Sequence, residues 1–147
     1  MGFFSALDIG ASGLTAQRLR MDTISQNIAN VNTTRTEDGT PYRRREVIFE
    51  EREGSDSFAS ALSDASSKLY GGQGVRVSKI AEDPSEFKKV YDPGHPDADA
   101  DGYVSMPNVD IVTEMVNMIS ATRSYEANVT SINATKSMAL KALEIGK

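Results

Sequence analysis

The chain of 147 residues contains no cysteine and no tryptophan, and it has a single histidine. Without cysteine there can be no disulfide framework, no cysteine-ligated zinc or iron–sulfur centre and no thiol nucleophile. The one histidine, His95, lies between Gly94 and Pro96 with no partner for nucleophilic catalysis nearby in the sequence. We therefore expect no enzyme activity, no catalytic or metal-binding residues, no cofactor and no small-molecule substrate.

Long apolar runs are also lacking. No uncharged apolar stretch approaches the ~20 residues that cross a bilayer, so we expect no membrane span. Residues 1–7 are apolar but carry no basic leader before Asp8, so we expect no cleaved signal peptide.

The formal net charge is −5, which makes the chain a poor ligand for nucleic acid. Arg43, Arg44 and Arg45 form a local basic patch, but acidic residues follow at once, which favours a solvated strand edge or an intersubunit contact.

Charge is distributed unevenly along the chain. Residues 1–31 and 108–147 are each neutral, so residues 32–107 carry the whole excess of acidic groups. This distribution is typical of a protein whose two ends are packed together while its middle is solvated; chance is the alternative.

Helical spacing of apolar side chains predicts a long helix at each end of the chain. In residues 4–31 the stripe includes Leu7, Leu14, Met21 and Ile28. Gly10 and Gly13 in that stretch either allow a second helix to approach closely or indicate that the helix begins near Ser12. Residues 109–145 contain no glycine or proline, with Asn108 or Asp110 as the N-cap and Gly146 as the stop. Their stripe includes Ile111, Met115, Met118, Tyr125, Val129, Ile132 and Leu143.

The middle of the chain has the content of a small β-rich module. Strand-like segments occur at 42–51, 74–80, 87–91 and 103–106, and residues 54–70 are predicted to form a flexible loop. The predicted organisation is an N-terminal axial helix (1–33), a β-rich module (34–107) and a C-terminal axial helix (108–147). We expect an α+β fold in which the two helices form one helical core domain, as an antiparallel coiled-coil-like pair.

The length of the second helix predicts self-association. At about 1.5 Å per residue it spans ~55 Å, whereas a compact domain of this size is only ~40 Å across. Its apolar stripe is therefore too long to be buried within one molecule. We expect the chain to form homo-oligomers.

One acidic stretch matches half of a calcium-binding loop. Asp97, Asp99, Asp101 and Gly102 have the spacing of the first half, but Asn108 stands where a bidentate glutamate is required. Pro107 also interrupts the segment that would form the following helix. We expect a solvated acidic turn, with a calcium-binding coiled-coil module and a generic coiled-coil oligomer as alternatives.

The two ends carry motifs that resemble those of a known family. Near the end of the first helix stand Ser25, Gln26, Asn27, Ile28, Ala29, Asn30, Val31, Asn32 and Thr33, a run rich in side-chain amides in which Asn30 or Asn32 can end the helix. In the second helix, residues 120–128 include Arg123, Tyr125, Glu126, Ala127 and Asn128. Both motifs resemble the terminal signatures of the bacterial flagellar axial proteins. Residues 39–43, 91–104, 106–110 and 114–117 are further similar to proximal rod members of that family; another rod subunit is the alternative.

The resemblance implies a structural role rather than catalysis. Members of the family pass through the flagellar type III export apparatus without a cleaved signal peptide. They polymerise helically around an axial channel, forming a rod in the periplasm that transmits motor torque. The implied partners are further copies of the chain and other rod subunits of the FlgB, FlgF and FliE type. Within such a subunit, we expect the apolar stripes to supply cohesion, and the amides of Asn27, Asn30 and Asn128 to fix the register of the helices.

Overall fold

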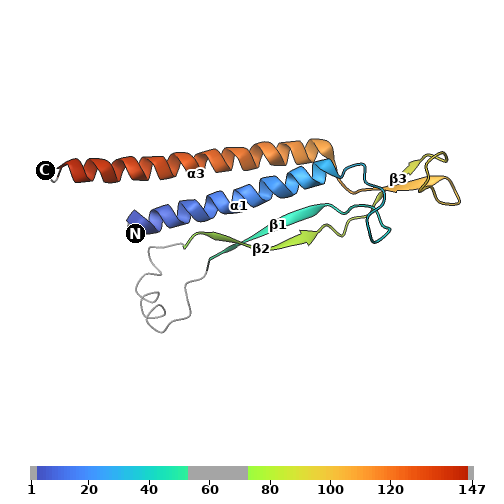
Figure 1. Cartoon of the computed structure of the whole chain (residues 1–147), viewed down its shortest axis with the longest axis horizontal. Helices are drawn as coiled ribbons and strands as arrows, with labels where there is room; N and C mark the ends of the chain where they lie inside the picture. Colours follow the sequence, from blue (N-terminus) through green and yellow to red (C-terminus); the bar gives the residue numbers. More distant parts are fainter. Residues whose placement is uncertain (1–2, 53–72, 146–147) are drawn as a thin grey trace, which may run out of the picture. The chain divides into compact units, whose positions relative to one another are not determined.

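The computed structural model describes residues 3–52 and 73–145 (Figure 1). In chain order its elements are α1 (Phe3–Ala29), β1 (Arg45–Glu51), β2 (Val75–Glu82), β3 (Lys88–Tyr91), β4 (Tyr103–Met106) and α3 (Ile111–Ile145). The predicted α+β fold class is confirmed, because two long terminal helices bracket two small antiparallel sheets, β1–β2 and β3–β4. The predicted loop at 54–70 and the helix stop at Gly146 lie outside the described residues.

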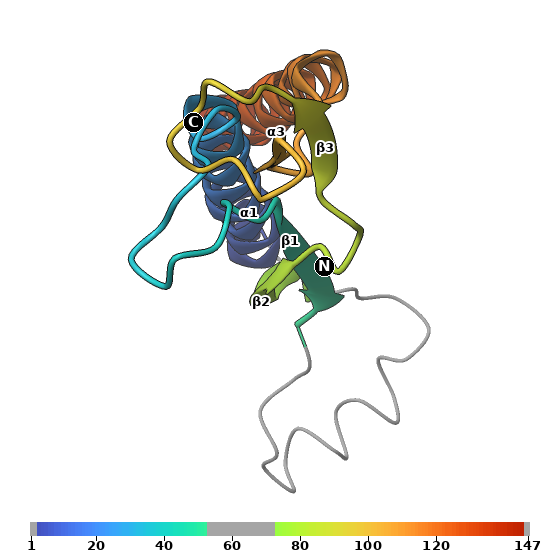
Figure 2. The same cartoon turned by 90° about the vertical axis from the view of Figure 1, so that its right-hand side faces the viewer.

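The chain divides into two compact units. The first unit consists of Met1–Arg18, Phe49–Ser78 and Thr122–Lys147, and the second of Leu19–Ile48 and Lys79–Ala121. Each long helix contributes to both units, and so do β1 and β2, which pair with each other (Figure 2). The predicted division at 33/34 and 107/108 stays a prediction.

In the first unit, the two helices approach closely at glycines of α1. A Cβ atom placed on Gly10 would lie 2.7 Å from Cγ1 of Ile132, and one on Gly13 would lie 2.9 Å from Nδ2 of Asn128. The residue of α3 that lies opposite α1 has a lower number at Gly13 (Asn128) than at Gly10 (Ile132). The two helices therefore run antiparallel here. Helix α1 begins at Phe3 rather than near Ser12, so both glycines lie inside the helix and provide close approach.

The second unit holds the most deeply buried side chains. Its apolar core includes Ile24, Tyr42, Val104, Val109 and Ala121, and its buried polar residues include Asn27 and Glu114. Strands β3 and β4 pair in antiparallel register from Lys88 opposite Met106 to Tyr91 opposite Tyr103. A left-handed turn at Gly102 (φ 80°) precedes β4, a conformation that glycine adopts without strain.

In the second unit, side-chain hydrogen bonds cap the end of α1 and the start of α3. Asn30 donates from Nδ2 to the carbonyl of Gln26 and accepts from the hydroxyl of Thr33, so the amide of Asn30 caps α1. At the start of α3, Oδ1 of Asp110 accepts the backbone N–H of Thr113 at 2.9 Å. Asp110 is therefore the N-cap of α3, and Asn108 makes different contacts.

The first strand is shorter than predicted, beginning at Arg45 rather than Tyr42. The backbone N–H of Tyr42 donates to the carbonyl of Thr33, and that of Arg44 donates to Oδ1 of Asn108. These N–H groups bond to a loop and to a side chain instead of a neighbouring strand. Residues 42–44 therefore lie outside the ladder, although the sequence predicted that the strand would include them.

Candidate functional site

Asn27, near the end of α1, is completely buried and makes four hydrogen bonds. Its Oδ1 accepts from the backbone N–H of Arg45 at 2.9 Å and from the hydroxyl of Tyr42 at 3.0 Å. Its Nδ2 donates to the backbone carbonyl of Arg45 and to Oε2 of Glu114, each at 2.9 Å. The amide pairs with both backbone groups of Arg45 as a neighbouring strand would, and its hydrogen-bonding capacity is fully used.

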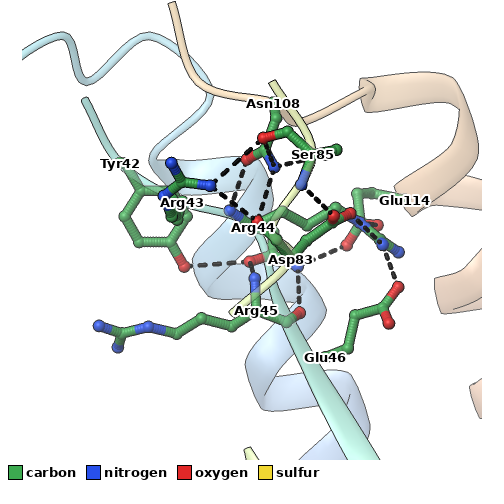
Figure 3. A network of polar contacts seen from close by, with 10 residues as sticks. Tyr42, Arg43, Arg44, Arg45, Glu46, Asp83, Ser85, Asn108 and Glu114 are labelled. Carbon is green, nitrogen blue, oxygen red and sulfur yellow. Dashed lines mark hydrogen bonds and ion pairs between the residues drawn. The ribbon is translucent and has the colours of Figure 1, made fainter. Parts of the chain in front are cut away.

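Glu114, in the first turn of α3, is also completely buried. Its second carboxylate oxygen accepts from Nε of Arg44 at 2.8 Å, so the buried negative charge is paired with a guanidinium. Arg44 extends this network, since Nη1 contacts Asp83 at 3.4 Å and also contacts Glu46 (Figure 3). A buried carboxylate is tolerated only when it is paired and hydrogen-bonded, and both conditions hold here.

Asn108 joins the segment before α3 to the same network. Its Oδ1 accepts the backbone N–H of Arg44 at 2.8 Å. Its Nδ2 donates to the hydroxyl oxygen of Ser85 at 2.8 Å and to the carbonyl of Asp83 at 3.2 Å (Figure 3). Arg43 reaches the same two residues, donating from Nη1 to the carbonyls of Asp83 and Ser85. We call the cluster of Asn27, Tyr42, Arg44, Asp83, Asn108 and Glu114 the polar junction.

The electrostatics of the polar junction follow from burial and pairing. Burial raises the pKa of Tyr42 above its ordinary value, and the charges of Glu114 and Glu82 add to the rise against the opposing effect of Arg45. Burial alone would lower the pKa of Arg44, but its hydrogen bond to Glu114 raises the pKa overall. The backbone N–H of Ser85 donates to Asp83 and lowers the pKa of that carboxyl group. The network therefore favours charged Arg44 and Asp83 and a neutral Tyr42.

This chemistry suits a structural connection. The side chains of Asn27 and Glu114, each with no solvent exposure, have their partners within the chain. The junction joins four segments: the end of α1, the start of β1, the loop after β2 and the first turns of α3. A satisfied buried network of this kind holds its elements in one arrangement, because any shift of a helix would leave a buried polar group unpaired.

Comparisons with known proteins agree with this structural reading. Residues 7–35 match a family described as flagella basal body rod protein, and residues 100–145 match the C-terminal family of flagellar basal body rod FlgEFG proteins. Flagellar basal-body rod protein FlgC of Bacillus subtilis (strain 168) is 54% identical, with all of both chains covered. The chain belongs to the FlgC family of flagellar basal-body rod proteins. FlgC of Borreliella burgdorferi is 52% identical, over 99% of this chain and 98% of the relative, and FlgC of Salmonella typhimurium is 42% identical over the whole of both chains.

Family membership confirms the predicted function class. The chain is a structural subunit of the flagellar basal-body rod, and its family is not one of enzymes. As a rod subunit of the FlgC family, it assembles with other rod proteins. Among the helices of the described residues, none has the length and apolar character needed to cross a membrane. Asn27 falls in the first region that matches a family model and Glu114 in the second, so their hydrogen bond links the two regions.

The N-terminal motif contributes one residue, Asn27, to the polar junction. Asn27 is buried at its centre, Ile28, Asn30 and Thr33 are half-buried, and Ser25, Gln26, Ala29 and Asn32 are exposed. Of the three asparagines expected to fix the register of the helices, Asn27 bonds to α3 and Asn30 caps its own helix. Asn128 lies against Gly13 in the first unit.

The C-terminal motif lies along the middle of α3. Tyr125 and Asn128 are half-buried, whereas Arg123, Glu126 and Ala127 are exposed. Tyr125 and Asn128 belong to one face of the helix, because residues three and four apart share a face. The motif therefore combines residues directed toward the molecule with residues that face solvent.

The predicted apolar stripe divides into half-buried and exposed residues. Leu7, Leu14, Met21, Ile28, Met118, Tyr125, Val129 and Ile132 are half-buried. Ile111, Met115 and Leu143 are 46%, 55% and 72% exposed. The α3 positions with no exposure are Glu114 and Ala121, which were not part of the stripe. One sequence signal could have identified Glu114, since it is the only charged residue between Ile111 and Thr122.

The half-match to a calcium loop forms a hydrogen-bonded turn. Oδ1 of Asp99 accepts the backbone N–H groups of Asp101 and Tyr103, and Asp97 contacts the hydroxyl of Thr34 and the guanidinium of Arg35. In residues 3–52 and 73–145 no three histidine, aspartate or glutamate side chains converge to hold a metal ion. Asp99 therefore stabilises its own turn, and Asp97 connects this turn to the loop that follows α1.

Proposed function

We propose that this chain forms part of the proximal rod by helical polymerisation through its terminal helices. In this proposal the rod transmits motor torque and encloses the export channel. The observation that carries the proposal is a row of exposed apolar side chains on α3, consisting of Ile111, Val112, Met115, Val116 and Ile119, each 46–71% exposed. A continuous apolar row of this size on a rod subunit is typical of a protein–protein interface.

The geometry of α3 separates this row from the polar junction. Each residue turns an α-helix by ~100°, so Val116 lies ~200° round the helix from Glu114. Glu114 contacts Asn27 of the molecule's own α1 and Arg44 just before β1, whereas the exposed row extends from ~60° (Ile111) to ~200° (Val116) round the helix from Glu114. One face of α3 serves the fold of the subunit, and the other is available to neighbouring subunits.

Torque transmission requires a subunit that does not shear internally. The polar junction meets this requirement because its hydrogen bonds join α1, β1 and α3. Every donor and acceptor of the Asn27 amide takes part in these bonds. Contacts between different surfaces of successive copies do not close on themselves and so produce a filament. Rod length is then set by the neighbouring proteins.

The proposed partners are copies of this chain and rod subunits of the FlgB, FlgF and FliE type. We also propose that the chain reaches the periplasm through the flagellar type III export apparatus, without a cleaved signal peptide. Both proposals are supported by its membership in the FlgC family.

The substitution Met115→Asp tests the interface without touching the polar junction. It places a charge in the exposed row, and we expect swimming to be lost and the chain to be absent from isolated basal bodies, while the free subunit unfolds at the same urea concentration as before. The matched control is Thr113→Asp, which adds the same charge ~200° round the helix at an exposed position. Normal swimming by cells with Met115→Asp would refute the proposed interface.

A further inference from the structure

An apolar groove lies at the start of α3 in the second unit. Its volume is about 310 Å³, and its apolar lining includes Val31, Val90, Met106, Val109, Ile111 and Val112. Ile111 and Val112 also begin the exposed row of α3, so groove and row form one continuous apolar surface. Lys88 and Asp110 stand at the groove, with 3.8 Å between Nζ and the carboxylate and with more than half of each side chain exposed.

The other end of α3 is exposed and apolar on two faces. Met138, Leu140, Leu143 and Ile145 are 65%, 53%, 72% and 86% exposed. At ~100° per residue, Met138 and Ile145 point to one side of the helix, and Leu140 and Leu143 to the other. A helix end that is apolar on more than one side is typical of a helix surrounded by other protein.

The charged side chains at the C-terminal end of α3 match those at the groove. The last turn of α3 contains Glu144 and no basic residue, so its charge adds to the negative end of the helix dipole. Lys141 forms an exposed ion pair with Glu144, at 2.8 Å. At the groove, Lys88 can pair with Glu144 of the helix end, and Asp110 can pair with Lys141. The charges of the two exposed ion pairs are therefore complementary.

We propose that the groove at the start of α3 receives the C-terminal turns of α3 from a second copy of this chain. Val112 and Leu140 are ~42 Å apart along one helix, so a chain cannot fill its own groove with these turns. Because groove and helix end are different surfaces, each copy leaves one of each free, and the contact propagates head to tail. This inference rests on the proposed function and deepens it by naming the surfaces that meet.

A photo-crosslinking experiment in assembled rods tests the proposal. Benzoylphenylalanine replaces Val112 in cells whose swimming depends on this chain, and basal bodies are isolated after irradiation. We expect mass spectrometry to find the adduct on residues 138–145 of another copy. Benzoylphenylalanine at Thr113, the adjacent residue on another side of α3, is the matched control and is expected to give no such adduct.

The outcomes separate this inference from the proposed function. If the cells swim and the adduct lies on another rod protein, on a different part of this chain, or is missing, then the groove does not receive the helix end. If basal bodies assemble normally without this chain, the proposed function itself fails.

A cysteine experiment provides a second measurement, because the natural chain has no cysteine. A chain with both Val112→Cys and Leu143→Cys is expected to give a ladder of disulfide-linked oligomers in oxidised basal bodies. The same experiment with Thr113→Cys and Leu143→Cys should give at least tenfold fewer linked chains. Equal ladders from both pairs would overturn the proposal.

Discussion

Asn27 and Glu114, 87 residues apart in the sequence, share a hydrogen bond of 2.9 Å, and neither side chain is exposed to solvent. This contact joins the end of the first helix to the beginning of the last. Each residue also bonds to the segment around β1, Asn27 to Arg45 and Glu114 to Arg44. The pair therefore unites three segments of the subunit at one buried point.

Asn27→Ala should lower the free energy of unfolding by about 3–4 kcal/mol. The substitution removes four hydrogen bonds and leaves the backbone groups of Arg45 and one oxygen of Glu114 without the partner they had. Urea denaturation followed by circular dichroism measures the change. Asn32→Ala, at an exposed position of the same motif, is the control and should stay within about 0.5 kcal/mol of the natural chain. Equal effects from both substitutions would show that Asn27 has no special role.

Arg44 and Glu114 should show strong energetic coupling in a double-mutant cycle. Arg44→Met leaves a buried carboxylate without its cation and should cost about 3–5 kcal/mol. Combining it with Glu114→Leu removes both charges, so the double variant should be more stable than the two single losses predict, by about 1–3 kcal/mol. Urea denaturation of all four chains gives the coupling energy. Additive losses would indicate that the two side chains act independently.

Asp83 should make the stability of the subunit sensitive to acid. Its pKa in the folded state is lowered, chiefly by the hydrogen bond from the backbone N–H of Ser85, so the stabilisation is present above the ordinary value of 3.8 and is lost as the pH falls through the folded-state pKa. Asp83→Asn removes this contribution. The difference in unfolding free energy between the natural chain and the variant should be constant between pH 7 and about pH 5, and should shrink below about pH 4. A difference that does not change down to pH 2.5 would contradict this linkage.

Gly10→Val should destabilise the helix pair of the first unit by about 2 kcal/mol. A Cβ atom at this position meets Ile132 at 2.7 Å, so the larger side chain forces the helices apart or Ile132 out of place. Ala11→Val, at the adjacent exposed position, is the control and should cost only about 0.5 kcal/mol from helix propensity. Thermal unfolding measures both effects. Adding Ile132→Ala to Gly10→Val should recover part of the loss, and the absence of any recovery would argue against a steric cause.

The ends of the chain were the most predictable part of the molecule. Apolar spacing and the lack of glycine and proline predicted the helix at 109–145, which begins at Ile111. The amide-rich motif at 25–33 pointed to the flagellar axial proteins, and the comparisons confirm that family. Local signals sufficed here, because helical periodicity and a contiguous motif are both encoded by neighbouring residues.

The polar junction was only partly predictable. Asn27 was expected to make a specific amide contact, but its partners Glu114, Tyr42 and Arg45 were not identified. The sequence around Arg43 to Arg45 predicts a solvated strand edge or an intersubunit contact, yet Arg44 is largely buried against Glu114. Charge patterning cannot show which of three adjacent arginines turns inward, because the deciding partner lies 70 residues away.

The sequence by itself determined the two helices, the α+β class, the lack of cysteine chemistry and the membership in a flagellar family. Each of these depends on composition or on residues close together in the chain. Only the tertiary structure decided that a charged glutamate and an asparagine, rather than the apolar stripe, hold the most buried positions where α1 meets α3. The physical reason is that a buried carboxylate is stable only beside the cation and the amide that pair with it, and the fold brings these groups together from three distant segments.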